Sequence, residues 1–339
     1  MRRIAMVLAL AGLVTGAAAC KKGADAGGGA GNKTAAASSA LDIFPEDTAV
    51  IGGISITKLT SSKLWATYSP MIMDNAEAKD GLAKLKDACG LDPTKDFEQV
   101  IVGVNGELDE KQIIFLIKGK FDEPKISKCL TAMAEKSTPP KKITAKTEGK
   151  ISTYAEEGGK TAYVGWPASD TILIVPSAMD GDKAALEAVL AGKTSAKNNK
   201  DLSAIIGNVD TSNTIWAALA VPPAGKLKDS MAGAGSSGPP PKAVWVNLSY
   251  QKDLSLQAGL RFASDKDAKD QVDKFNKELE TAKADATSGP YLKTAKIEAK
   301  GSDAIFSINL DEKQVDELVA KLKDLLPLLM MGMGGGGGM

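Results

Sequence analysis

The stretch LSLQAGLRF, residues 254–262, decides the fold class that this sequence predicts. Its apolar residues recur at every second position, and Ser255, Gln257 and Arg261 fall between them. This alternation predicts a β-strand with one buried and one solvent-facing side. Antiparallel sheets commonly have one solvated face, so we expect an antiparallel sheet here.

A helix and further strands follow this stretch. Residues 267–284 carry apolar side chains at helical spacing, namely Ala268, Val272, Phe275 and Leu279. This spacing predicts a long amphipathic helix. A final helix is expected from Asp311, because Gln314 completes a start that resembles a capping box. The strands expected in this half are residues 214–221, 243–250, 254–262, 293–299 and 304–310.

The preceding half repeats this order. Its expected strands are residues 48–56, 100–104, 113–117, 143–147, 151–154, 162–166 and 171–175. Its expected helices are residues 61–89, a helix that starts near Asp122 and Pro124, and residues 181–191. We therefore predict an α+β fold with two similar domains, residues 41–198 and 199–331. Each would be a mainly antiparallel sheet with helices on one face. A Pro/Gly/Ser loop at residues 222–242 is peculiar to the second domain.

The first nineteen residues have the anatomy of an export signal. Arg2 and Arg3 precede the apolar run IAMVLALAGLV, residues 4–14, and a stretch of small residues leads to Cys20. A basic start, a short apolar core and a small-residue cleavage site are typical of a signal peptide. The apolar run is shorter than the roughly 20 residues that a spanning helix needs. We predict a signal peptide at residues 1–19.

The cleavage site resembles the lipobox of bacterial lipoproteins. Ala18, Ala19 and Cys20 match that pattern, and Ala17 stands where Leu is usual. The resemblance implies a diacylated Cys20 as the new N-terminus and a lipid-anchored protein of the bacterial envelope. Lys21 is compatible with the outer membrane, facing the periplasm or the surface. An ordinary secretory signal with an incidental Cys20 is the alternative.

The opening FPEDTAVIGGISI, residues 44–56, extends the resemblance when taken with the duplicated unit. Taken together, the lipobox, this opening and the duplicated unit resemble uncharacterised bacterial envelope lipoproteins with duplicated α+β domains. No motif of that group carries a catalytic residue over to this chain. Residues 20–40 are small and polar, which predicts a flexible tether behind the lipid anchor, and the Gly-rich residues 332–339 are expected to be disordered.

Composition excludes several classes of function. The chain has 42 basic and 42 acidic residues, so no net field attracts it to nucleic acid. It contains no His, which excludes Ser-His-Asp and Cys-His catalysis and any zinc site that uses His. Hydrolysis by two carboxylates remains open. The acidic residues mostly stand at helix starts or beside Lys, where caps and solvated faces are the simpler reading.

Two short motifs resemble ligand sites. GAGSSG, residues 233–238, fits the G-x-G-x-x-G pattern, but Pro239 to Pro241 follow it where a dinucleotide site needs a helix. Asp180-Gly181-Asp182 resembles a calcium loop whose later ligands are missing, so a capped helix start is expected. We therefore predict no cofactor and no metal site.

The remaining cysteines predict a disulfide. With Cys20 acylated, Cys89 and Cys129 are an even pair in an exported chain. Oxidising compartments favour disulfides, and both residues lie on apolar helix stripes that would meet if the helices run antiparallel on one sheet face. Two buried thiols that never meet are the alternative.

The large aromatic residues include one candidate binding feature. Trp65 with Tyr68, near Pro70, predicts an apolar groove or, more simply, core packing. Trp216 and Trp245 lie in apolar strands and are expected in the core.

The function predicted from these observations is a non-enzymatic, lipid-anchored binding or interaction module. Its membrane contact is the lipid anchor, and a protein or an apolar small molecule is the expected partner. The first alternative is a periplasmic carrier or chaperone with an apolar ligand in a deep cleft between the domains. The second alternative is a carboxylate-dependent hydrolase, which needs two acids in a pocket and a raised carboxyl pKa.

Overall fold

A computed structural model describes residues 40–73, 76–108, 113–137, 140–192, 195–228, 239–286 and 288–320. The signal peptide, Cys20 and most of the predicted tether lie outside these residues. The GAGSSG motif and the Gly-rich tail, with residues 321–331 before it, also lie outside them.

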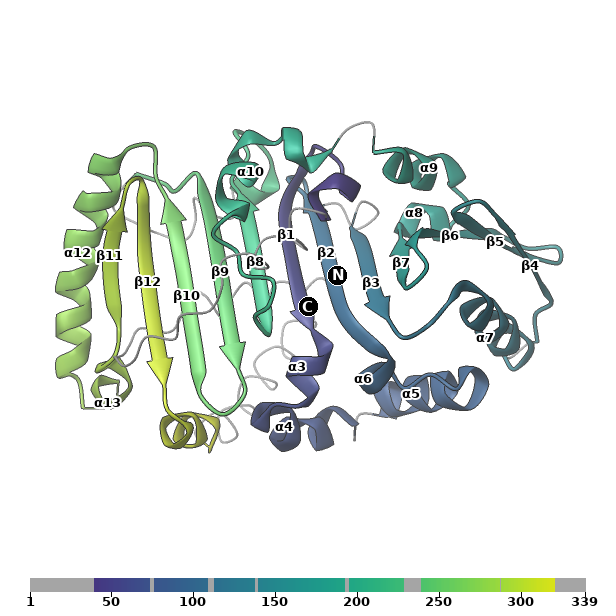
Figure 1. Cartoon of the computed structure of the whole chain (residues 1–339), viewed down its shortest axis with the longest axis horizontal. Coiled ribbons are helices and arrows are strands. Elements are labelled where there is room, and N and C mark those ends of the chain that lie inside the picture. Colours follow the sequence, from purple (N-terminus) through teal and green to yellow (C-terminus); the bar gives the residue numbers. More distant parts are fainter. Residues whose placement is uncertain are drawn as a thin grey trace, which may run out of the picture.

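The strands form one twelve-stranded sheet (Figure 1), in the order β11-β12-β10-β9-β8-β1-β2-β3-β7-β6-β5-β4. Every neighbouring pair is antiparallel. The strands are β1 (Thr48–Ser55), β2 (Phe97–Asn105), β3 (Ile114–Gly119), β4 (Ile143–Glu148), β5 (Ile151–Glu156), β6 (Thr161–Ala168), β7 (Thr171–Ile174), β8 (Ile215–Ala220), β9 (Ala243–Tyr250), β10 (Leu254–Arg261), β11 (Lys296–Lys300) and β12 (Asp303–Leu310). The predicted α+β class and antiparallel sheet are confirmed.

The two halves of the chain meet inside this sheet. β1 of the first half pairs with β8 of the second, and Gly53 lies opposite Trp216. Outward from that junction, the first half runs β1-β2-β3-β7-β6 and the second runs β8-β9-β10-β12-β11. Both halves thus contribute to one sheet, and their division into two similar domains stays a prediction.

The helices are α3 (Ile56–Thr60), α4 (Lys63–Met73), α5 (Ala76–Cys89), α6 (Pro93–Asp96), α7 (Glu123–Glu135), α8 (Pro176–Met179), α9 (Lys183–Ala191), α10 (Lys200–Ile206), α12 (Asp265–Ala284) and α13 (Gly289–Leu292). Several helices begin at a side chain that caps them, among them α7 at Asp122, α9 at Asp182 and α12 at Ser264. The predicted capping box is confirmed, because the Asp311 amide donates to Gln314 Oε1 (3.1 Å) and the Gln314 amide donates to Asp311 Oδ1 (2.8 Å). A helix at residues 312–320 follows it.

One side of the sheet holds the largest core. Leu202 and Ile205 of α10 pack there with Trp216 and Trp245, and side chains of α8 and α9 extend the same cluster over β6 and β7. This side therefore has a continuous apolar core that crosses the junction of the two halves. Both tryptophans are almost fully buried, as expected from the apolar strands that carry them.

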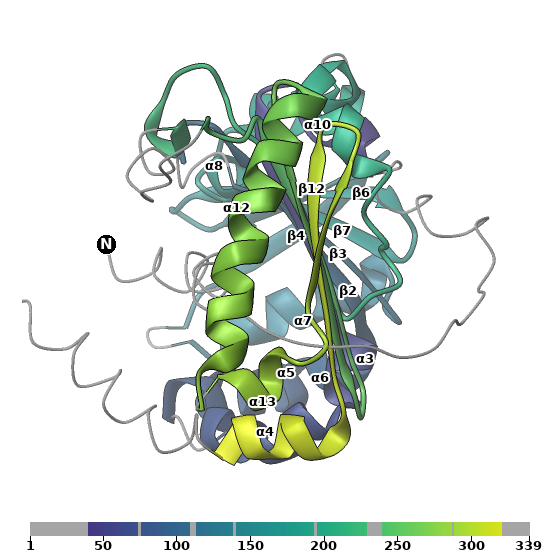
Figure 2. The ribbon, with the colours of Figure 1, turned by 90° about the vertical axis from the view of Figure 1, so that its left-hand side faces the viewer.

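Helices also cover both ends of the opposite side. At one end α5 and α7 pack on β3, β6 and β7 through Cys129, Trp166 and their neighbours. At the other end α12, α13 and residues 312–320 pack on β10, β11 and β12. Figure 2 shows α12 beside the sheet, which is seen edge-on. The expectation of helices on one face is wrong, because strands such as β2, β8 and β9 are apolar on both sides.

Candidate ligand-binding face

The central strands carry a second apolar surface on the side of α7 and α12. Residues that pair across antiparallel strands point to the same side of the sheet. One such row runs Ile117, Val100, Ile54, Ile215, Leu248, Leu256, Ile308. Its first member packs under α7, and its last two pack near residues 312–320. The four residues between them belong to β2, β1, β8 and β9.

We call this surface the central face. Its large side chains are Val50, Ile54, Val100, Val102, Ile215, Leu219, Val244, Val246 and Leu248, with Gly52, Ala217 and Ala258 between them. All of the large side chains are partly exposed, and none belongs to a core cluster formed by the residues that the structure describes. The adjacent residues Ile51, Ile101 and Trp216 point to the other side and are buried. The same strands are therefore fully packed on one side and incompletely covered on the other.

Helices border the central face. Figure 1 places α12 and α13 at one end of the sheet, α5 and α7 at the other end, and α3 and α4 at the lower ends of the central strands. Lys63 of α4 forms ion pairs with Glu312 (3.1 Å) and Asp316 (2.7 Å) of the last described helix. These pairs connect α4 to the helix beside the face.

The chemistry of the central face is restricted to apolar contact. Its side chains are hydrocarbon only, so they neither donate nor accept a hydrogen bond and carry no acid or base. Covering such a surface is favourable in proportion to the apolar area removed from water. The face can therefore hold an apolar group, and it offers nothing to a reacting bond.

A separate cavity of about 300 Å³ lies at the junction of the halves. Its lining is mixed, with polar residues such as Asp47 and Glu107 beside apolar ones such as Val221 and Pro222. Asn199, also in its wall, donates through Nδ2 to the Thr48 carbonyl (3.1 Å) and caps α10 by accepting from the Leu202 amide (3.1 Å). The carrier alternative predicts a deep apolar cleft at the junction, and this mixed lining includes the acidic residues Asp47, Glu107 and Asp201.

Glu123, at the start of α7, is the centre of a polar network in the first half. Its Oε1 accepts hydrogen bonds from Ser127 Oγ (2.5 Å), Thr147 Oγ1 (2.6 Å) and Ser152 Oγ (3.2 Å). These hydroxyls, that of Ser127 foremost, hold the pKa of Glu123 below its usual value because they stabilise the charged form. The hydrolase alternative needs a carboxyl with a raised pKa, and Glu123 shifts in the opposite direction.

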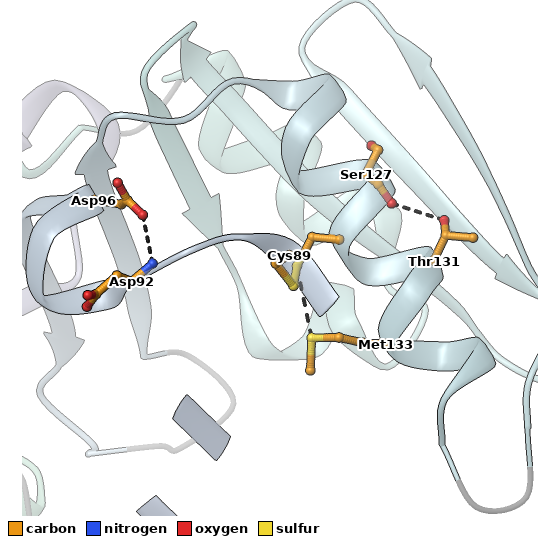
Figure 3. Close-up of a disulfide and its surroundings, with 7 residues drawn as sticks. Cys89, Asp92, Asp96, Ser127, Thr131 and Met133 are labelled. Atoms are coloured by element: carbon orange, nitrogen blue, oxygen red, sulfur yellow. Dashed lines mark hydrogen bonds between the residues drawn. A yellow bond between two sulfur atoms is a disulfide. The ribbon is translucent and has the colours of Figure 1, made fainter. Parts of the chain in front are cut away.

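Cys89 and Cys129 form a disulfide between α5 and α7, with their Cα atoms 4.3 Å apart. Figure 3 shows the bond with Met133 beside it, and Met133 Sδ lies 4.0 Å from Cys129 Sγ. Both cysteines belong to the apolar cluster of the first half. The bond therefore fastens α5 to the helix that covers one end of the sheet.

The structure assigns the other candidate residues as follows. Trp65 and Tyr68 both lie on α4; Trp65 is half-buried, and the Tyr68 side chain lies outside what the structure describes, so their groove stays a prediction. Asp182 caps α9 by accepting from the Ala185 amide (3.1 Å), as expected for a helix start.

The described ranges contain no cluster of His, Cys, Asp or Glu that would hold a metal ion. Among them, no helix is long and apolar enough to cross a bilayer.

Sequence reasoning missed the central face. The signal for it is that residues 100–104, 215–220 and 243–246 are apolar at nearly every position, without the alternation of residues 254–262. Such runs indicate strands that are apolar on both sides. They do not reveal that the described helices fully cover only one of these sides.

No protein-family model and no curated protein matches the chain. Among solved structures, it is similar to TP0453 in two crystal forms. Crystal form I matches at 12% identity and a TM-score of 0.44, over 84% of this chain and 97% of the other. Crystal form III matches at 12% identity and a TM-score of 0.43, over 83% and 97%.

Proposed function

We propose that this chain is a lipid-anchored envelope protein that binds an apolar ligand on its central face and catalyses no reaction. The observation that carries the proposal is the incomplete cover of that face. Side chains such as Val246 and Ile215 are partly exposed in the middle of a twelve-stranded sheet, on strands whose other side carries the buried Trp245 and Trp216. Soluble proteins rarely leave a contiguous apolar surface of this kind uncovered without a binding role.

The ligand chemistry follows from the lining. A ligand on this face finds no partner for a polar group, so its bound part is a hydrocarbon chain. Each buried CH₂ contributes about 0.8 kcal/mol, which makes a long acyl chain a suitable ligand. From Val100 on β2 to Leu248 on β9 the face crosses three strand spacings, roughly 14 Å. An acyl chain therefore has room to lie across it.

The lipid anchor predicted at Cys20 would keep the binding face beside a source of such ligands. Two acyl chains would hold the protein on a bilayer, where one chain would bind only marginally. The N-terminal peptide from a membrane fraction should carry the acyl chains, and Cys20→Ser should remove both the chains and the membrane attachment. An unacylated wild-type N-terminus would refute the anchor.

The binding proposal is tested with the full chain in bacterial membranes and a palmitate that carries a photoreactive diazirine. Val246→Glu puts a charge in the middle of the central face, and the matched control Gln257→Glu puts the same charge on the neighbouring strand, facing the other side. Photolabelling should fall strongly in the first variant only. Equal labelling of both variants and the wild type would refute binding at this face, provided that both variants keep the thermal stability of the wild type.

A further inference from the structure

We propose that the edge strand β4 pairs antiparallel with β4 of a second copy of this chain, so that the two sheets join into one. This inference goes beyond the proposed function, because β4 carries none of the residues of the central face. In the described part of the chain, the sheet ends at β4 on one side and at β11 on the other, and these two edges differ in their cover.

The β11 edge is covered by α12. A short turn joins β11 to β12, and the residues that flank it, Lys300 and Asp303, pair across the strands. Antiparallel strands bond through alternate residues, so the backbone groups of Ile297 point away from β12. The Ile297 carbonyl accepts a hydrogen bond from Asn276 Nδ2 of α12 (3.3 Å). Figure 1 shows α12 alongside β11, so a further strand has no access to this edge.

The β4 edge has no such cover. The Glu157 amide donates to the Lys142 carbonyl (3.0 Å), so residues 142, 144, 146 and 148 are the ones that bond to β5. The amides and carbonyls of Ile143, Ala145 and Thr147 therefore point away from β5, and none of the described residues bonds to them. Residues 144–148 are exposed, and Figure 1 shows β4 as the outermost element at its end of the sheet. A row of unused backbone donors and acceptors is a template for another strand.

Charge selects the register in which two copies of β4 fit together. A two-fold axis pairs the same strand with itself, and only the outward residues bond across it. With Ala145 opposite Ala145 of the second copy, Lys142 of each chain stands opposite Glu148 of the other. The two neighbouring registers place Lys146 opposite either Lys142 or itself, and like charges directly opposite are destabilising. The strand is therefore complementary to itself in one register.

The charged side chains of this register are free to form the new pairs. Ile143 packs in the cluster under α7, so Lys142 and Glu148 lie on the side of the sheet away from that helix. Within one chain, Lys142 pairs with Glu157 and Glu148 pairs with Lys146. More than half of each of these side chains is exposed, and exposed pairs contribute little to stability. Their rearrangement on pairing of two copies therefore costs little.

The experiment uses the full chain in bacterial membranes with one added cysteine. Ala145→Cys stands opposite itself in the proposed register, with Cα atoms about 5.5 Å apart, within the range of a disulfide. Ala299→Cys is the matched control, because it replaces an exposed alanine at the covered edge. The chain without an added cysteine gives the background from Cys20. After oxidation and electrophoresis without reductant, we expect roughly tenfold more cross-linked dimer from position 145 than from position 299.

A charge exchange in the Ala145→Cys chain tests the register. Glu148→Lys turns both intermolecular pairs into like-charge pairs and should lower cross-linking about five- to tenfold. Lys142→Glu combined with Glu148→Lys restores opposite charges and should restore the cross-link. Thermal unfolding equal to that of the wild type verifies that each variant is folded.

Three outcomes would overturn this inference. The first is a dimer yield at position 145 that does not exceed the yield at position 299. The second is a cross-link that Glu148→Lys leaves unchanged, because the strands then meet in another register. The third is a cysteine at position 145 that cross-links to a different protein, which would assign the edge to another extended chain. Each of these outcomes leaves the proposed function intact, since palmitate labelling of the central face is measured separately.

Discussion

Gly53 of β1 lies against the indole of Trp216 of β8, so closely that a Cβ on the glycine would stand 2.4 Å from the ring. The two residues pair across the strands that join the halves of the chain. Gly259 and Trp245 repeat this relationship between β10 and β9, where a Cβ would stand 2.2 Å from the indole. Each tryptophan thus covers a glycine of the neighbouring strand, and these contacts pack the side of the sheet opposite the central face.

Gly53→Ala should therefore destabilise the protein. The added methyl group overlaps a buried ring, and overpacking of this kind costs typically about 1–3 kcal/mol. Urea unfolding of the full chain measures the effect. Gly207→Ala is the control, because a Cβ there meets nothing within 4 Å. Equal midpoints for Gly53→Ala and the wild type would show that Trp216 moves aside without cost.

Reduction of the Cys89–Cys129 bond should lower the free energy of unfolding. The bond closes a loop with a sequence separation of 40, which corresponds to about 4 kcal/mol in the chain-entropy model. Hydrogen exchange with and without reductant should show the loss first in α5 and α7. The variant Cys89→Ala with Cys129→Ala is the control and should not respond to reductant. Exchange in α5 and α7 that is unaffected by reductant would contradict the stabilising role.

Glu123 should make stability depend on pH. Its pKa is lowered in the folded state from an ordinary value of 4.5, chiefly by the Ser127 hydroxyl, so the charged form stabilises the fold. That stabilisation is complete above about pH 4.5 and is lost as the pH falls through the lower, folded-state pKa. Glu123→Gln should thus be less stable than the wild type at neutral pH, and the difference should shrink in acid.

The control for this prediction is Glu135→Gln, at the exposed end of the same helix. Thermal unfolding at a series of pH values measures both variants. A difference between Glu123→Gln and the wild type that is the same at every pH would exclude titration of Glu123 as its cause.

Arg261 forms a bidentate ion pair with Asp303 that connects β10 to β12. Its Nε and Nη2 donate to the two carboxylate oxygens at 2.7 Å each, and its Nη1 donates to the Ala204 carbonyl at 2.8 Å. The Asp303 side chain is only 8% exposed. Because Arg261→Met leaves this charge buried without its partner, we expect a loss of about 3 kcal/mol.

A double variant separates the ion pair from simple packing. Arg261→Met with Asp303→Leu removes both charges and should recover part of the stability lost in Arg261→Met, since apolar replacement of a whole buried pair is often neutral. Chemical unfolding of the single and double variants measures the coupling. Additive losses would show that the two side chains do not interact energetically.

The sequence predicted the local structure well where the signals are local. Alternation places β10, helical spacing places α12, and Asp311 with Gln314 marks the start of the last described helix. The pairing of Cys89 with Cys129 follows from the even number of cysteines that remain besides Cys20 and from the two apolar helix stripes that carry them. Each of these signals can be recognised from residues close together in the sequence or from the number of cysteines.

The arrangement of the sheet depends on distant contacts, and it could not be predicted in the same way. Two separate sheets and one continuous sheet have the same alternation, and only the pairing of β1 with β8 distinguishes them. Likewise, Ile51 and Val50 are both apolar neighbours on β1, yet in the described part of the chain Ile51 is fully buried and Val50 is partly exposed. The central face is therefore a property of helix placement, which depends on the whole fold.

The most direct test of the binding proposal is to locate the bound acyl chain. The full chain in membranes is photolabelled with the diazirine-bearing palmitate, digested, and the modified residues are identified by mass spectrometry. The account predicts labels on β1, β8 and β9, at central-face residues such as Ile54, Ile215 and Val246, and a loss of these labels with excess unlabelled palmitate. Labels confined to other surfaces, or labels on the central strands that excess palmitate does not remove, would contradict it.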